Sequence, residues 1–239
     1  MAIQSRLHEF DIDSLRVEAT IVADAGAAGK RPVVLVFHAW AGQDDFARDK
    51  ARRLAELGYI GLAVDLFGKG RRGSTREECS ALMTPLVQDR ALLKRRIEAT
   101  AAEAARVPGA DTARLGAIGY CFGGLCALDL ARAGVPGVRG VASFHGLLTP
   151  PGWPAGRITA KVLALHGYDD PMSQPDSLRA FCNEMTAAGA DWEVNAYGAT
   201  VHAFTNQEAN DPAFGTVYSA QADARSWART TAFLAEVLG

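Results

Sequence analysis

The stretch Leu115-Gly-Ala-Ile-Gly-Tyr-Cys121-Phe-Gly-Gly-Leu-Cys-Ala-Leu-Asp-Leu-Ala-Arg-Ala-Gly134 predicts a strand, a tight turn and a helix in direct succession. Gly119, Gly123 and Gly124 let the backbone reverse sharply and let strand and helix approach closely. Cys121 then stands alone at the top of a strained turn, as in a nucleophile elbow, with cysteine where serine is commoner. The dipole and free N–H groups of the following helix favour thiolate over thiol. The alternative is a buried structural cysteine.

The composition is that of an ordinary globular chain of 239 residues, with 49% hydrophobic residues, 22% charged residues and a net charge of −2. No apolar run approaches the ~20 residues of a membrane helix, and the N-terminus lacks the order of a secretory signal, so we expect a cytoplasmic protein without a membrane partner. Dispersed basic residues argue against nucleic acid. The four cysteines show no CxxC pairing and no metal-ligand spacing, so we expect neither zinc nor a disulfide framework.

Predicted strands and helices alternate along the chain. The strands are residues 17–22, 33–37, 59–67, the run before Cys121, 140–144, 161–165 and 192–197. The helices begin at Asp44 or Asp45, at Thr84 and Pro85 (ending near residue 106), after Cys121, at residue 173 and at residue 219. This order predicts a single α/β domain, residues 1–239, with a mainly parallel central sheet and helices on both faces. The basic residues Arg90, Lys94, Arg95 and Arg96 are expected to face solvent.

Two further residues stand past the ends of predicted strands, where such sheets carry their chemistry. Asp170 lies in His166-Gly-Tyr-Asp-Asp-Pro171, and His202 follows the last strand. The chain order Cys121, Asp170, His202 is that of α/β-hydrolases. His202 would hold the sulfur of Cys121 as thiolate and transfer protons, while Asp170 would orient the imidazole and stabilise its cation. Asp169 is a rival acid one position earlier, and Asp170, beside Pro171, could instead initiate a turn.

Four segments resemble the dienelactone hydrolase family: His38-Ala-Trp-Ala-Gly42, Gly119-Tyr-Cys-Phe-Gly-Gly124, His166-Gly-Tyr-Asp-Asp-Pro171 and His202-Ala-Phe-Thr-Asn206. The resemblance covers nearly the whole chain. It implies an α/β-hydrolase fold, a triad of Cys121, His202 and Asp170, and no cofactor. It also implies an oxyanion hole formed by the backbone N–H groups of Trp40 and Phe122.

Two positions depart from the family's pattern. Ala39 replaces the usual glutamate that takes part in switching the thiol between resting and reactive forms, so this switch is expected to be missing or altered. Asn206 replaces an arginine that grips the substrate carboxylate in relatives acting on dienelactone, so neutral substrates are expected to be preferred. Arg71, Arg72 or Arg76, which follow the strand 59–67, could supply a replacement cation.

The sequence therefore predicts a hydrolase of small carboxylic esters or lactones, present as a monomer or homodimer. In this hypothesis the thiolate of Cys121 forms an acyl-enzyme, which water activated by His202 then hydrolyses. The alternative is a catalytically silent binding protein on the same fold, or a protein in which Cys121 is a redox-responsive thiol.

Overall fold

The computed structural model describes residues 2–153 and 156–239. Its main sheet has eight strands in the order β1-β2-β4-β3-β5-β6-β7-β8. β2 pairs antiparallel with both β1 and β4, and the remaining neighbours pair in parallel. The strands are β1 (Ile3–Ile12), β2 (Leu15–Asp24), β3 (Arg31–Phe37), β4 (Ile60–Ala63), β5 (Ala110–Tyr120), β6 (Val138–Phe144), β7 (Lys161–Gly167) and β8 (Trp192–Tyr197). The predicted mainly parallel sheet is confirmed.

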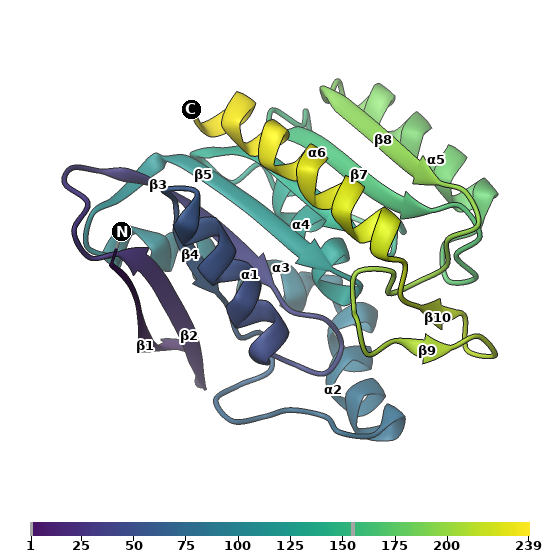
Figure 1. Ribbon diagram of the computed structural model, residues 1–239, viewed down its shortest axis with the longest axis horizontal. Helices are drawn as coiled ribbons and strands as arrows, with labels where there is room; N and C mark the ends of the chain where they lie inside the picture. Colours follow the sequence, from purple (N-terminus) through teal and green to yellow (C-terminus); the bar gives the residue numbers. More distant parts are fainter. Residues whose placement is uncertain (1, 154–155) are drawn as a thin grey trace.

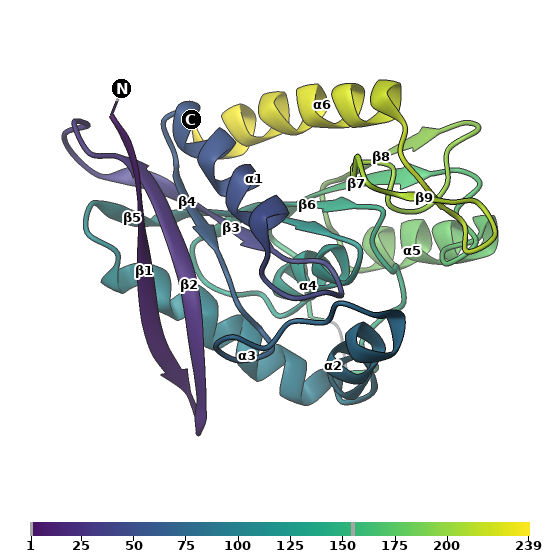
Figure 2. The ribbon, with the colours of Figure 1, turned by 60° about the horizontal axis from the view of Figure 1, so that its bottom comes forward.

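Helices cover both faces of this sheet (Figures 1 and 2). Two pack on one face, α1 (Asp45–Glu56) and α6 (Ala220–Leu238), and four on the other, α2 (Arg76–Gln88), α3 (Arg90–Glu103), α4 (Phe122–Arg132) and α5 (Pro175–Ala187). β3 shows why both faces need cover. Its side chains alternate, so Val33, Leu35 and Phe37 enter one core and Val34 and Val36 the other.

The start predicted at Thr84 and Pro85 for the helix after the glycine-rich loop is wrong. Helix α2 begins at Arg76, because Thr75 and Glu78 form a capping box that satisfies its first N–H groups. Pro85 lies inside α2, and the helix ends at Gln88, within one turn of it. Asp89 then caps α3, so the predicted long helix is two helices, with a 3-10 turn (Ala104–Arg106) after the second.

The sequence did not predict three of the strands. β1 was not predicted, because this edge strand is exposed along most of its length and only Phe10 and Ile12, near its end, enter the core. A short ribbon, β9 (Asn210–Asp211) and β10 (Thr216–Val217), lies between β8 and α6 and was also missed. Helix α6 begins at Ala220, one residue after the predicted start at residue 219, and Ser219 caps it.

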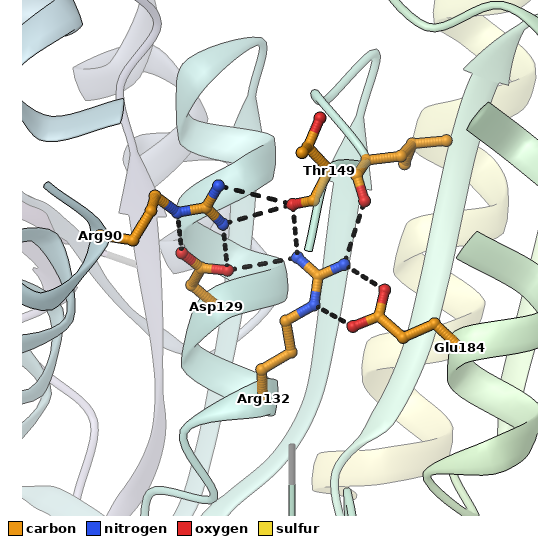
Figure 3. A network of polar contacts seen from close by, with 6 residues as sticks. Arg90, Asp129, Arg132, Thr149 and Glu184 are labelled. Carbon is orange, nitrogen blue, oxygen red and sulfur yellow. Dashed lines mark hydrogen bonds and ion pairs between the residues drawn. The ribbon is translucent and has the colours of Figure 1, made fainter. Parts of the chain in front are cut away.

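The prediction that Arg90 faces solvent is wrong. Arg90 is buried, and its side chain is part of a network of ion pairs (Figure 3). Its guanidinium donates to both carboxylate oxygens of Asp129 at 2.8 and 2.6 Å. Arg132 donates to Asp129 at 3.2 Å and to Glu184 at 2.9 and 2.7 Å, and both arginines reach the carbonyl oxygen of Thr149 at 3.4 Å. Since Asp129 and Arg132 lie on α4, this network fixes the helix that follows Cys121 against α3 and α5.

Candidate active site

Cys121 occupies a strained turn between β5 and α4. Its backbone angles, a φ of 56° and a ψ of −116°, lie outside the regions that residues other than glycine usually adopt. The turn closes tightly, because a Cβ atom on Gly119 would lie 1.9 Å from the carbonyl oxygen of Gly123. Strain of this kind costs on the order of 1–3 kcal/mol and persists where the surrounding structure enforces it. The backbone therefore has the elbow geometry predicted from the sequence.

His202 and Asp170 form a buried pair in the loops that follow β8 and β7. Nδ1 of His202 lies 2.7 Å from Oδ2 of Asp170, and the side chains are 2% and 0% exposed. The other carboxylate oxygen of Asp170 accepts from the N–H of Met172 at 2.8 Å, which fixes the acid. Asp169, the rival acid, is exposed. The structure thus brings His202 to Asp170.

The charge state of His202 is set by its neighbours. Burial lowers the pKa of His202, but the negative charge of Cys121 and the hydrogen bond that His202 donates to Asp170 raise it more, to about 10. Nε2 of His202 is covered and has no partner of good hydrogen-bond geometry in the described part of the chain. His202 is therefore an imidazolium at neutral pH when Cys121 is a thiolate.

Two backbone N–H groups are the candidate oxyanion donors, that of Phe122, which directly follows Cys121, and that of Trp40, which lines the same cavity as Cys121. Within residues 2–153 and 156–239, neither Trp40 nor Phe122 donates its N–H to a protein acceptor. Phe122 is the first residue of α4, where the dipole adds positive potential. A Cβ atom on Gly123 would lie 2.1 Å from the carbonyl oxygen of Phe37, so the start of α4 touches the end of β3. This contact brings the Phe122 and Trp40 segments together.

His38 has a structural role next to Ala39. Its Nε2 accepts from the N–H of Leu66 at 3.2 Å, so its proton is on Nδ1, which donates to the carbonyl oxygen of Ala39 at 2.6 Å. Burial lowers the pKa of His38 and keeps the ring neutral. His38 thus connects the end of β3 to the segment after β4, while Ala39 places only a methyl group on the cavity wall.

A cavity of about 940 Å³ opens over Cys121 and His202. Trp40, Asn206 and Arg76 also line it. Arg76 forms an ion pair with Asp211 and lies 4.3 Å from the centre of the Phe214 ring, which itself stacks on Trp40. Arg76 is therefore held at the rim by the β9–β10 ribbon.

The other two candidate substrate cations point elsewhere. Arg71 donates to the carbonyl oxygen of Phe67 at 3.1 Å, Arg72 donates to Gln43 at 2.8 Å, and neither lines the cavity. Lys50, which the sequence did not single out, lines it at 5% exposure. Its ammonium lies 4.6 Å from the centre of the Phe46 ring and forms no ion pair with any residue that the structure describes. Burial lowers the pKa of Lys50.

His145 is the site residue that sequence reasoning missed. It directly follows β6, lines the cavity, and contacts both the backbone of Cys121 and the segment that carries His202. A signal was present, since His145 comes right after the predicted strand 140–144, at the sheet edge where the chemistry gathers.

The described part of the chain offers no group of three or more histidine, cysteine or acidic residues that could hold a metal ion. Among the helices whose placement is described, none is long and apolar enough to cross a membrane.

The sequence profile of the dienelactone hydrolase family matches residues 17–238, and the chain belongs to that family. A putative carboxymethylenebutenolidase of Methylorubrum extorquens is 30% identical over 190 residues, which are 74% of this chain and 64% of that protein. A probable 2-oxo-3-(5-oxofuran-2-ylidene)propanoate lactonase of Bradyrhizobium sp. is 26% identical over 217 residues, 86% of this chain and 84% of that protein.

The crystal structure of a dienelactone hydrolase-like promiscuous phosphotriesterase from metagenomic libraries matches the whole of both chains, with a TM-score of 0.93 and 35% sequence identity. The protein is thus a hydrolase of the dienelactone hydrolase family with the α/β-hydrolase fold.

Proposed function

We propose that this hydrolase cleaves small carboxylic esters or lactones with Cys121 as nucleophile, His202 as proton carrier and Asp170 as the group that orients His202. The observation that carries the proposal is the buried hydrogen bond of 2.7 Å between His202 and Asp170, beside a cysteine in a strained elbow. The names of the lactonase and carboxymethylenebutenolidase relatives support lactones as one substrate class.

In the first half of the reaction, the thiolate of Cys121 attacks the carbonyl carbon of the substrate. The carbonyl oxygen becomes an oxyanion, which accepts hydrogen bonds from the N–H groups of Trp40 and Phe122. Each such donor is typically worth ~3–4 kcal/mol of transition-state stabilisation. When the carbonyl reforms, the carbon–oxygen bond to the leaving group breaks, the leaving oxygen takes the proton of the His202 imidazolium, and a thioester remains on Cys121.

In the second half, neutral His202 takes a proton from water as the water oxygen attacks the thioester. The second oxyanion collapses, the carbon–sulfur bond breaks, and the carboxylic acid product leaves with the thiolate restored. His202 is then again an imidazolium beside a thiolate, as its pKa of about 10 favours. Because Ala39 has no carboxylate, this charged pair is the resting state in our proposal, without a switching acid.

The test is a panel of p-nitrophenyl esters and lactones with wild type and Cys121→Ala, together with iodoacetamide labelling. We expect turnover that Cys121→Ala abolishes, and alkylation of Cys121 before Cys79, Cys126 and Cys182. Burial raises the pKa of each of these three thiols, that of Cys126 most. Saturable binding without turnover would favour the silent binding protein, and turnover that survives Cys121→Ala would refute the mechanism.

A further inference from the structure

His145 uses both ring nitrogens to connect two parts of the site. Its Nδ1 accepts from the backbone N–H of Cys121 at 3.2 Å, an N–H that also donates to the carbonyl oxygen of Phe144 at 3.0 Å, so the ring proton of His145 is on Nε2. Nε2 then donates to the hydroxyl of Thr205, at 2.8 Å. The side chain is 3% exposed, and its backbone has a φ of 38°, in the left-handed region that costs energy for a residue with a Cβ atom.

The ring of His145 also forms one wall of the pocket that holds the His202 ring. The two ring centres lie 5.0 Å apart, edge to face, and Phe204 packs on His145 at 5.1 Å. Thr205 belongs to the same segment as His202, whereas Cys121 belongs to the elbow. His145 is therefore a bridge between the two segments that carry the nucleophile and its proton carrier.

The bridge is uncharged. Burial lowers the pKa of His145 well below 6.5, and the nearby charges of His202, Lys50 and His166 act in the same direction. A neutral ring can keep one acceptor and one donor beside an imidazolium without repelling it. A second imidazolium at this distance would oppose the charge on His202.

We propose that His145 is a positioning residue that sets the distance and ring orientation of His202 relative to Cys121, and thereby the fraction of Cys121 held as thiolate beside imidazolium. This inference rests on the proposed function for its catalytic consequence. A purely structural histidine with the same contacts would affect only folding.

Thr205→Val tests the bridge most cleanly, because it removes the acceptor for Nε2 of His145 and retains the side-chain shape. Thr205→Ser keeps the hydroxyl and serves as the rescue. Thr230→Val is the matched control, since Thr230 is a fully buried threonine whose hydroxyl donates to the carbonyl oxygen of Ser226 within α6. His145→Phe removes both hydrogen bonds and provides the larger perturbation.

The readouts are kcat and KM for p-nitrophenyl butyrate, normalised to titrated Cys121, and the rate of Cys121 alkylation by iodoacetamide from pH 5 to 9. We expect kcat to fall about tenfold to a hundredfold in Thr205→Val, with little change in KM, because misplaced reacting groups lose rate rather than substrate. In Thr205→Val, the ratio of the Cys121 alkylation rate at pH 6 to that at pH 9 should be lower than in the wild type. Thr205→Ser and Thr230→Val behave like the wild type.

If Thr205→Val lowers only the melting temperature and leaves kcat and the alkylation profile unchanged, His145 is structural and the inference is wrong. The inference is also wrong if Thr205→Ser restores neither kcat nor the alkylation profile. The alkylation profile does not depend on any substrate, so a wild type without esterase activity would refute the proposed function and still test the role of His145.

Discussion

Replacing Asp170 by asparagine removes one charge and leaves the side-chain shape. In the wild type Oδ2 of Asp170 accepts from Nδ1 of His202 at 2.7 Å, which leaves Nε2 for proton transfer. An asparagine amide can donate its NH₂ to Nδ1 and so favour the tautomer with the proton on Nε2. That tautomer cannot take a proton from water, so Asp170→Asn should stop the hydrolysis of the acyl-enzyme.

The structure gives the size of the effect. Burial lowers the pKa of His202, but Cys121 and Asp170 together raise it from 6.5 to about 10. This difference corresponds to about 5 kcal/mol in favour of the imidazolium. Asp170 contributes through its hydrogen bond and its charge, so its loss removes part of this stabilisation, and the wrong tautomer adds to the effect. We expect kcat to fall by about 10³ to 10⁴.

The assay is steady-state hydrolysis of p-nitrophenyl butyrate with both variants checked by circular dichroism. Asp169→Asn is the matched control, because Asp169 is exposed and the backbone hydrogen bond from its N–H to Thr200 at 3.0 Å survives the substitution. We expect Asp169→Asn to stay within about twofold of wild type. If folded Asp170→Asn retains kcat within a factor of about ten, or Asp169→Asn is the weaker enzyme, the assignment of the acid is wrong.

Three further predictions concern pH, stability and specificity. The value of kcat/KM should fall as pH rises through about 10, because His202 there loses the proton that it gives to the leaving group. A fall in kcat/KM that begins below pH 8 would contradict this. Asp129→Asn should lower the free energy of unfolding in urea by about 3–5 kcal/mol, because it leaves the buried guanidinium of Arg90 without an ion-pair partner, whereas Arg132 keeps Glu184. A loss no larger than that of Glu98→Gln, in the partly exposed pair with Lys94, would show that the network adds little. Neutral aryl esters should exceed dienelactone in kcat/KM, and Asn206→Arg should narrow the gap by regaining a contact of about 1.5–3 kcal/mol. A wild type that prefers the carboxylate, and loses this preference in Lys50→Met, would assign that role to Lys50 instead.

The features that the sequence predicts well depend on local rules. The elbow follows from Gly119 and Gly123, because only glycine lets strand and helix come so close. Asp170 and His202 could be paired in advance because parallel strands end at a common edge. The alternation of strands and helices similarly predicts the layers, since each buried strand needs cover on both faces.

The features that it does not predict depend on contacts between distant segments. His145 directly follows a predicted strand, but its contacts with Cys121 and Thr205, which distinguish it from a core histidine, arise only after the sheet has formed. Arg90 resembles its exposed basic neighbours, but its partner Asp129 lies in another helix. The start of α2 was misplaced because proline at a first helical turn is a common signal, whereas Pro85 lies inside a helix already capped at Thr75.

The central claim is that Cys121 forms a covalent acyl intermediate. Intact-protein mass spectrometry after rapid acid quench of the Asp170→Asn variant with p-nitrophenyl butyrate tests it directly, because this variant should acylate but hydrolyse the thioester slowly. We predict a mass increase of one butyryl group, located by peptide mapping on Cys121 and absent when Cys121→Ala is added. Turnover of the wild type with no adduct on Cys121, or an adduct on any other residue, would contradict the account.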